Sequence, residues 1–119
     1  MEHPLSAYHD ITHGAGLAVL TPAWMEYIFS SDTMEKFAEY GRNVFDLDPD
    51  LPDVETAETA IAMTREFFLS LGLPATLSEL GVTEQYLEEM AEKAANDRLS
   101  NAYVPLTKED VLAIYQSCL

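Results

Sequence analysis

Histidine is concentrated near the start of this chain. All three histidines, His3, His9 and His13, fall within an eleven-residue stretch of the 119-residue sequence. Histidine is the commonest metal ligand, and its side chain changes charge nearest to neutral pH. The concentration therefore indicates either metal binding or proton transfer. The alternative is that three histidines happen to lie together on a terminal segment, where sequence is weakly constrained.

The spacing of the histidines allows a small local metal site. His9 and His13 are four residues apart, so on one helix they would share a face, as in many metal-binding helices. A metal needs about three or four ligands that converge from a rigid frame. Asp10 would supply a third ligand, and His3 lies close enough in sequence to join them. On this interpretation the chain is a small autonomous metal-binding protein.

A longer motif surrounds these histidines. It reads His3-x-Leu5-Ser6-Ala7, then Asp10-x-x-His13-Gly14-x-Gly16-Leu17-Ala18, then Pro22-Ala23-Trp24-Met25. The motif resembles the iron-containing alcohol dehydrogenases, and most closely their butanol dehydrogenase branch. The resemblance continues to residues 106–115, which are similar to the last helix of that branch. It extends over the whole chain, most strongly at residues 2–25, and corresponds to the C-terminal helical part of a family enzyme.

The resemblance implies roles for two histidines. In that family an aspartate and three histidines bind divalent iron, and the last of these histidines precedes a glycine, as His13 precedes Gly14. Another histidine, ten residues earlier, lies in the substrate pocket and helps to move the alcohol proton without binding the metal. His3 matches it by spacing. The resemblance thus implies His13 as a metal ligand and His3 as a catalytic residue, with His9 structural or adjacent to the pocket.

The same resemblance implies that most of the family's site is missing from this sequence. The remaining histidine ligand would fall four residues before His3, and the aspartate, the first histidine and the glycine-rich nucleotide site would lie earlier still. Gly14-x-Gly16 is not a nucleotide motif, because no strand precedes it, and we expect it to permit close helix packing. One inherited ligand cannot hold iron by the family's geometry.

These considerations give three functional hypotheses. The leading one is the C-terminal metal and substrate domain of an iron-dependent, NAD(P)-linked alcohol dehydrogenase. The parent enzyme would act on a small alcohol or aldehyde, with iron, zinc or another divalent metal, while the isolated chain would be inactive. The second is a helical interaction module without catalysis, which the missing ligands favour. The third is the small histidine-cluster metal protein.

Charge and composition exclude several classes of partner. The formal net charge is −15, and no lysine or arginine precedes Lys36, so the chain repels phosphate backbones and anionic membrane surfaces. The apolar run at residues 15–25 is too short to span a bilayer, and no basic signal-peptide segment is present. We expect a cytoplasmic protein that binds neither nucleic acid nor membranes. The single cysteine, Cys118, is expected to be a small buried hydrophobe.

The sequence predicts an all-α fold. We expect helices at residues 3–12, 14–29, 33–44 and 54–71, a single turn that opens at Thr76, and helices that begin after Thr83 and Thr107. The helix at residues 14–29 is apolar on nearly all sides, so it should be the buried central helix, bent at Pro22. The whole chain, residues 1–119, would then be one helical bundle that resembles the C-terminal domain of the iron-containing alcohol dehydrogenase and dehydroquinate synthase-like fold.

Polar residues before these helices predict how they begin. Ser31 or Asp32, Thr83 and Thr107 are expected to cap the helices that follow them. The acidic segment at residues 46–53 resembles a calcium loop only in part, because Leu51 replaces the required glycine and Ala57 the bidentate glutamate. We expect a solvated loop that caps the next helix.

A surface argument predicts self-association. In an intact family enzyme, one side of this helical part would face the nucleotide-binding part across the active-site cleft. Alone, that side would expose an apolar patch near residues 3–20, which monomers rarely tolerate. We therefore predict a homo-oligomer, most simply a symmetric dimer that buries the N-terminal segment.

Overall fold

Helices alone make up the regular structure of the residues that this computed structural model describes, which are 1–96 and 103–119. They are α1 (Glu2–His9), α2 (His13–Ile28), α3 (Met34–Phe45), α4 (Asp53–Ser70), the 3-10 turn η1 (Ser78–Leu80), α5 (Leu87–Asn96) and α6 (Lys108–Ser117). The all-α prediction is confirmed for this part of the chain. Among the first four helices, the observed bounds differ most from the predicted ones at α1. This helix ends at His9 because Asp10 adopts a left-handed conformation with φ of 51°.

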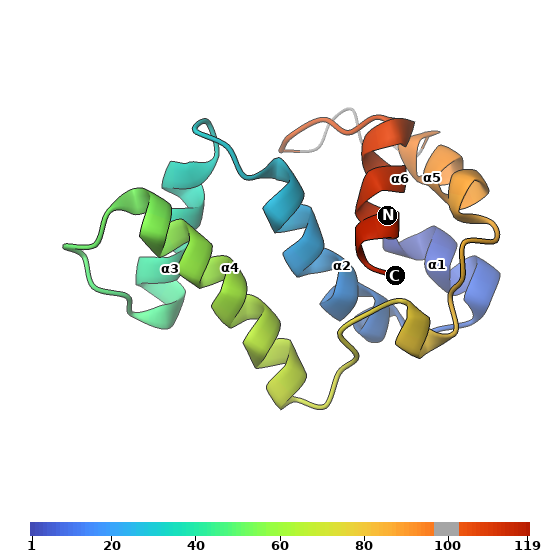
Figure 1. Ribbon diagram of the computed structural model, residues 1–119, viewed down its shortest axis with the longest axis horizontal. Coiled ribbons are helices and arrows are strands. Elements are labelled where there is room, and N and C mark those ends of the chain that lie inside the picture. Colours follow the sequence, from blue (N-terminus) through green and yellow to red (C-terminus); the bar gives the residue numbers. More distant parts are fainter. Residues whose placement is uncertain (97–102) are drawn as a thin grey trace.

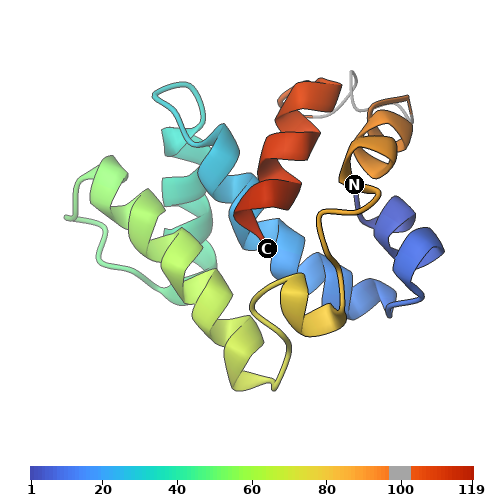
Figure 2. The same cartoon turned by 45° about the vertical axis from the view of Figure 1, so that its right-hand side comes forward.

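The helices form a flat molecule of 45 × 32 × 17 Å around α2. Figure 1 shows α2 crossing the middle, with α3 and α4 on one side and α1, α5 and α6 on the other. In the turned view of Figure 2, the C-terminal helix α6 lies against α2. The two ends of the chain lie close together, and the Tyr115 hydroxyl of α6 donates a hydrogen bond to the Met1 carbonyl. The N-terminal histidine segment is therefore held against the C-terminal helix.

The central helix α2 has more buried residues than any other helix described, as expected. They are Ala15, Gly16, Ala18, Val19, Leu20, Pro22, Ala23, Met25 and Ile28. The helix continues through Pro22 to Ile28, and the bend expected at Pro22 stays a prediction. Leu17 is an exception to the burial, since it is 41% exposed.

Two of the expected turn and cap motifs are confirmed. Thr107 caps α6, because its hydroxyl accepts from the backbone N–H of Asp110 while the Asp110 carboxylate accepts from the N–H of Thr107. Thr76 and Glu79 form the same reciprocal pair at the single turn η1, which ends at Gly81 with φ of 83°. Each of these motifs is complete within four residues, so the sequence contains all of its partners.

The other expected caps are wrong. Thr33, not Ser31 or Asp32, precedes α3. Its hydroxyl donates a hydrogen bond of 2.8 Å to the Ile28 carbonyl instead of capping the helix. Thr83 lies too early to cap α5, which begins at Leu87. The acidic loop makes no side-chain cap to α4, which follows Pro52.

Helix α4 is apolar over a wider face than α2 and α3 bury. Ala57, Ala60 and Ile61 are buried against α3 and α2, as the helical spacing predicts. Phe67 and Leu71, which continue this apolar spacing towards the end of the helix, are 53% and 60% exposed. Cys118 is buried as expected, and burial raises the pKa of its thiol. None of the described helices has the length and apolar character that crossing a membrane requires.

Candidate metal centre

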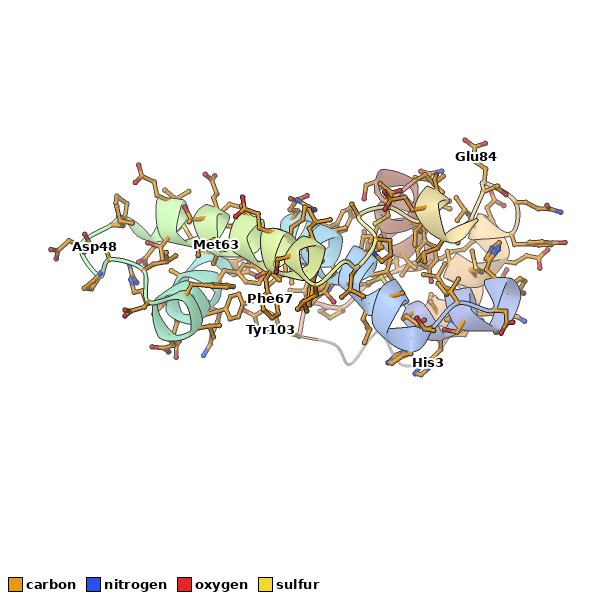
Figure 3. The ribbon with its side chains drawn as sticks, turned by 90° about the horizontal axis from the view of Figure 1, so that it is seen from below. His3, Asp48, Met63, Phe67, Glu84 and Tyr103 are labelled. Carbon is orange, nitrogen blue, oxygen red and sulfur yellow. The ribbon has the colours of Figure 1, made fainter. Side chains whose placement is uncertain are left out.

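The structure brings His3 and His13 together by reversing the chain, not by helical spacing. His3 lies in the first turn of α1 and His13 is the first residue of α2, and the left-handed residue Asp10 lies between the two helices. The imidazole rings stack with centroids 5.3 Å apart and planes 12° apart. Both residues are exposed, and Figure 3 shows His3 at the edge of the molecule.

His9 does not join this pair. Its ring lies 6.4 Å from the ring of Tyr86, and its Nε2 atom is buried without a hydrogen-bond partner in the described residues. His9 and His13 would share a face only on one continuous helix, and α1 ends at His9 before α2 begins at His13. The local site of His9, Asp10 and His13 is therefore not formed.

Glu2 is the third member of the cluster, and no sequence motif pointed to it. Its side chain is 2% exposed, compared with 56% for the side chain of His13. One carboxylate oxygen, Oε2, contacts Nδ1 of His13, and the other, Oε1, accepts a hydrogen bond from the Ser6 hydroxyl. The spacing of Glu2 and Ser6, four residues apart on one helix, was the available sequence signal.

Gly16 makes room for this carboxylate. A Cβ atom at Gly16 would lie 2.7 Å from Cγ and from Oε1 of Glu2, whereas a Cβ at Gly14 would meet nothing within 4 Å. The close packing expected of the Gly-x-Gly step is therefore confirmed at Gly16 and wrong at Gly14. Gly16 lies in the first turn of α2, where the helix dipole stabilises a nearby negative charge.

Among the described residues, Glu2 pairs with a histidine and not with a lysine or an arginine. In the described residues, the ion pairs of Lys36, Arg42 and Arg65 are made with other acids, and Glu2 pairs with His13. Burial raises the pKa of the core residue Tyr115 well above the usual tyrosine range, and the nearby Glu2 carboxylate raises it further.

Two open hollows flank the cluster. His3 contributes to one of about 400 Å³ together with Pro4, Ala7, Tyr8, Lys93 and Asn96. Glu2 contributes to another of about 260 Å³, whose remaining lining residues are Met1, Leu17, Leu20, Thr21, Trp24 and Leu106. His3 and Glu2 thus each open onto a different hollow.

The donor set suits part of a site for a divalent metal. One ligand atom from each of Glu2, His3 and His13 lies within 4.8 Å of the others, and imidazole and carboxylate groups are ligands that iron and zinc accept. Both oxygens of Glu2 are already used by Ser6 and His13, however, and so is Nδ1 of His13. The residues therefore fit one side of a metal site through Nε2 of His13, and they do not make a complete site.

Comparison with known proteins shows the same family from sequence and structure. The model of the Fe-containing alcohol dehydrogenase family, C-terminal, matches residues 1–119. NADH-dependent butanol dehydrogenases A and B of Clostridium acetobutylicum are 49% and 45% identical over 98% of this chain and 30% of their own length. A crystal structure of 1,3-propanediol oxidoreductase matches 99% of this chain and 31% of its own, with a TM-score of 0.85 and 29% identity.

The likeness extends to a solved butanol dehydrogenase. NADH-dependent butanol dehydrogenase A from Thermotoga maritima superposes with a TM-score of 0.81 at 26% identity, over 98% of this chain and 31% of that one. This chain thus spans about a third of the length of the relatives it matches. The match of the family model to every residue confirms the resemblance of the motifs, and the chain belongs to the Fe-containing alcohol dehydrogenase family, as its C-terminal domain.

Proposed function

We propose that this chain supplies one wall of the active site of an iron-dependent, NAD(P)-linked alcohol dehydrogenase, with His13 as a metal ligand and His3 as a catalytic residue. The observation that supports this most directly is the stacking of His3 on His13 beside the buried Glu2. Their exposure leaves both rings accessible to a small alcohol or aldehyde. The names of the relatives, which include butanol and 1,3-propanediol enzymes, support that substrate class.

The residues have separate tasks in this proposal. A bound divalent metal would polarise the alcohol oxygen, and the nicotinamide ring would accept the hydride. His13 would present its Nε2 lone pair, because its Nδ1 contacts Glu2. His3, stacked beside it, would take up the alcohol proton on its free imidazole and release it to water. The exposed position of His3 makes that release direct.

We further propose that the chain alone neither oxidises alcohols nor binds iron tightly. Hydride transfer requires alcohol, metal and nicotinamide in close and aligned contact, and loss of that arrangement removes many orders of magnitude in rate. The described residues offer one side of a metal site and have no strand to support a dinucleotide motif. The parent enzyme would supply the other ligands and the nucleotide site.

A chimera tests the proposal. This chain would replace the corresponding third of butanol dehydrogenase A of Clostridium acetobutylicum, to which it is 49% identical. We expect butanol-dependent NAD(P) reduction by the chimera, loss of metal and activity in its His13→Ala variant, and reduced activity with retained metal in its His3→Ala variant. The isolated chain should show no activity. Activity of the isolated chain that depends on His13 would contradict the proposal.

A further inference from the structure

Glu2 is unusual among the acidic residues of this protein because it is buried. In the described part of the chain, no other aspartate or glutamate falls in the buried class. A buried carboxylate without compensation is strongly unfavourable, so it requires hydrogen-bond donors around it. Its position at the start of α1, against the first turn of α2, gives it those donors from both helices.

We infer that Glu2 is a positioning residue that keeps the proton of the His13 imidazole on Nδ1 and its lone pair on Nε2. An ionised carboxylate accepts hydrogen bonds and does not donate them. Oε2 of Glu2 contacts Nδ1 of His13, so that nitrogen is the donor. A neutral imidazole carries one N–H group, and the lone pair therefore lies on Nε2.

The surroundings of Glu2 fix its carboxylate in this position. The Ser6 hydroxyl donates to Oε1, which leaves Oε2 for His13. The missing side chain of Gly16 provides the space that Cγ and Oε1 occupy. Ser6 and Gly16 thus come from different helices and constrain the same carboxylate.

The arrangement has a consequence for metal binding. Because the His13 side chain is 56% exposed while Nδ1 contacts a buried group, its outward edge carries Nε2. Histidine ligands commonly donate their other ring N–H to a carboxylate, which fixes the ring and its tautomer, and loss of such a partner costs about 10- to 100-fold in metal affinity. Glu2 would therefore act through His13 and would not bind the metal itself. This consequence rests on the proposed role of His13 as a ligand.

The tautomer is measured on this chain without any metal. Long-range proton–nitrogen NMR spectra of an isotope-labelled sample at about pH 8.5, above the ordinary histidine pKa, distinguish the two neutral forms. We expect His13 in the Nδ1–H form, and a shift towards the Nε2–H form in Glu2→Gln. Glu84→Gln removes an exposed charge and should leave His13 unchanged. Wild-type His13 in the Nε2–H form would overturn the inference.

A second pair of variants tests the same point without altering an ionisable group. Gly16→Ala would displace the Glu2 carboxylate, whereas Gly14→Ala meets nothing nearby. We expect the His13 tautomer to change in Gly16→Ala and not in Gly14→Ala. If Glu2→Gln does not fold, this pair and the wild-type spectrum decide the question. An unchanged tautomer in a folded Gly16→Ala or Glu2→Gln protein would contradict the inference.

Metal affinity separates this inference from the proposed function. In the chimera, competition with a zinc chelator should show Glu2→Gln weakening Zn²⁺ binding by about 10- to 100-fold. If His13→Ala left Zn²⁺ affinity unchanged, the proposed ligand role would fail, while the tautomer result would still stand. If His13→Ala abolished binding and Glu2→Gln had no effect, the positioning role would fail and the ligand role would remain.

Discussion

At the scale of single residues, Tyr115 connects the histidine segment to the hydrophobic core. Its side chain is fully buried, and its hydroxyl donates to the carbonyl of Met1, the residue before Glu2. Burial raises the pKa of Tyr115, and the nearby carboxylate of Glu2 raises it further. A tyrosine with a raised pKa in the folded state resists ionisation there, although the unfolded chain ionises at the ordinary value of 10.0.

This shift predicts alkaline destabilisation. Because the folded-state pKa is raised, the stabilisation is fully present below pH 10.0 and is lost as pH rises through the folded pKa. Urea unfolding followed by circular dichroism should show the free energy of unfolding falling as pH rises above 10.0. Tyr115→Phe should flatten the dependence and cost about 1 kcal/mol at neutral pH through loss of the hydrogen bond. An equally steep fall in the phenylalanine variant would show that another group is responsible.

At the scale of the elements, the sequence predicted the features that depend on residues close together in the chain. It missed the contacts that form only where the chain reverses between two helices. The Thr107 cap depends on Asp110, three residues away, and it is confirmed. The contact of Glu2 with His13 depends on the left-handed turn at Asp10, and no periodic sequence pattern predicts such a turn. Thr33 was missed for a similar reason, since its hydroxyl is used by the preceding helix. Motifs placed the two proposed functional histidines in the sequence, but only the fold placed Glu2 beside them.

The packing of α3 against α4 gives a sharp prediction at this scale. A Cβ at Gly41 would lie 2.9 Å from Cβ of Ala60 and 3.0 Å from Cδ1 of Leu47. Gly41→Ala should therefore destabilise the protein by about 1–3 kcal/mol, as overpacking does. Gly14→Ala is the matched control, because its Cβ meets nothing and alanine favours the helix. Equal midpoints for both variants in urea unfolding would contradict the close approach of the two helices.

At the scale of the whole molecule, a flat and strongly acidic body carries two apolar surfaces on different helices. One surrounds the hollow formed by Leu17, Leu20 and Trp24 of α2. The other covers the α3–α4 pair, where Val44 and Phe67 are 61% and 53% exposed. Among the described helices, α2 is the only one outside this pair that the pair contacts, through α4. The net charge of −15 opposes the approach of two copies at either surface.

Self-association should consequently depend on salt. We predict a dimer through the α2 surface, because Leu17 is 41% exposed there beside an apolar hollow. Sedimentation at high micromolar concentration should show more dimer at about 0.5 M salt than at about 0.05 M, since salt screens the repulsion. Leu17→Glu should give a monomer, whereas Val44→Glu adds the same charge to the α3–α4 surface and should not. A monomer at all salt concentrations, or a dimer lost only in Val44→Glu, would refute the α2 interface.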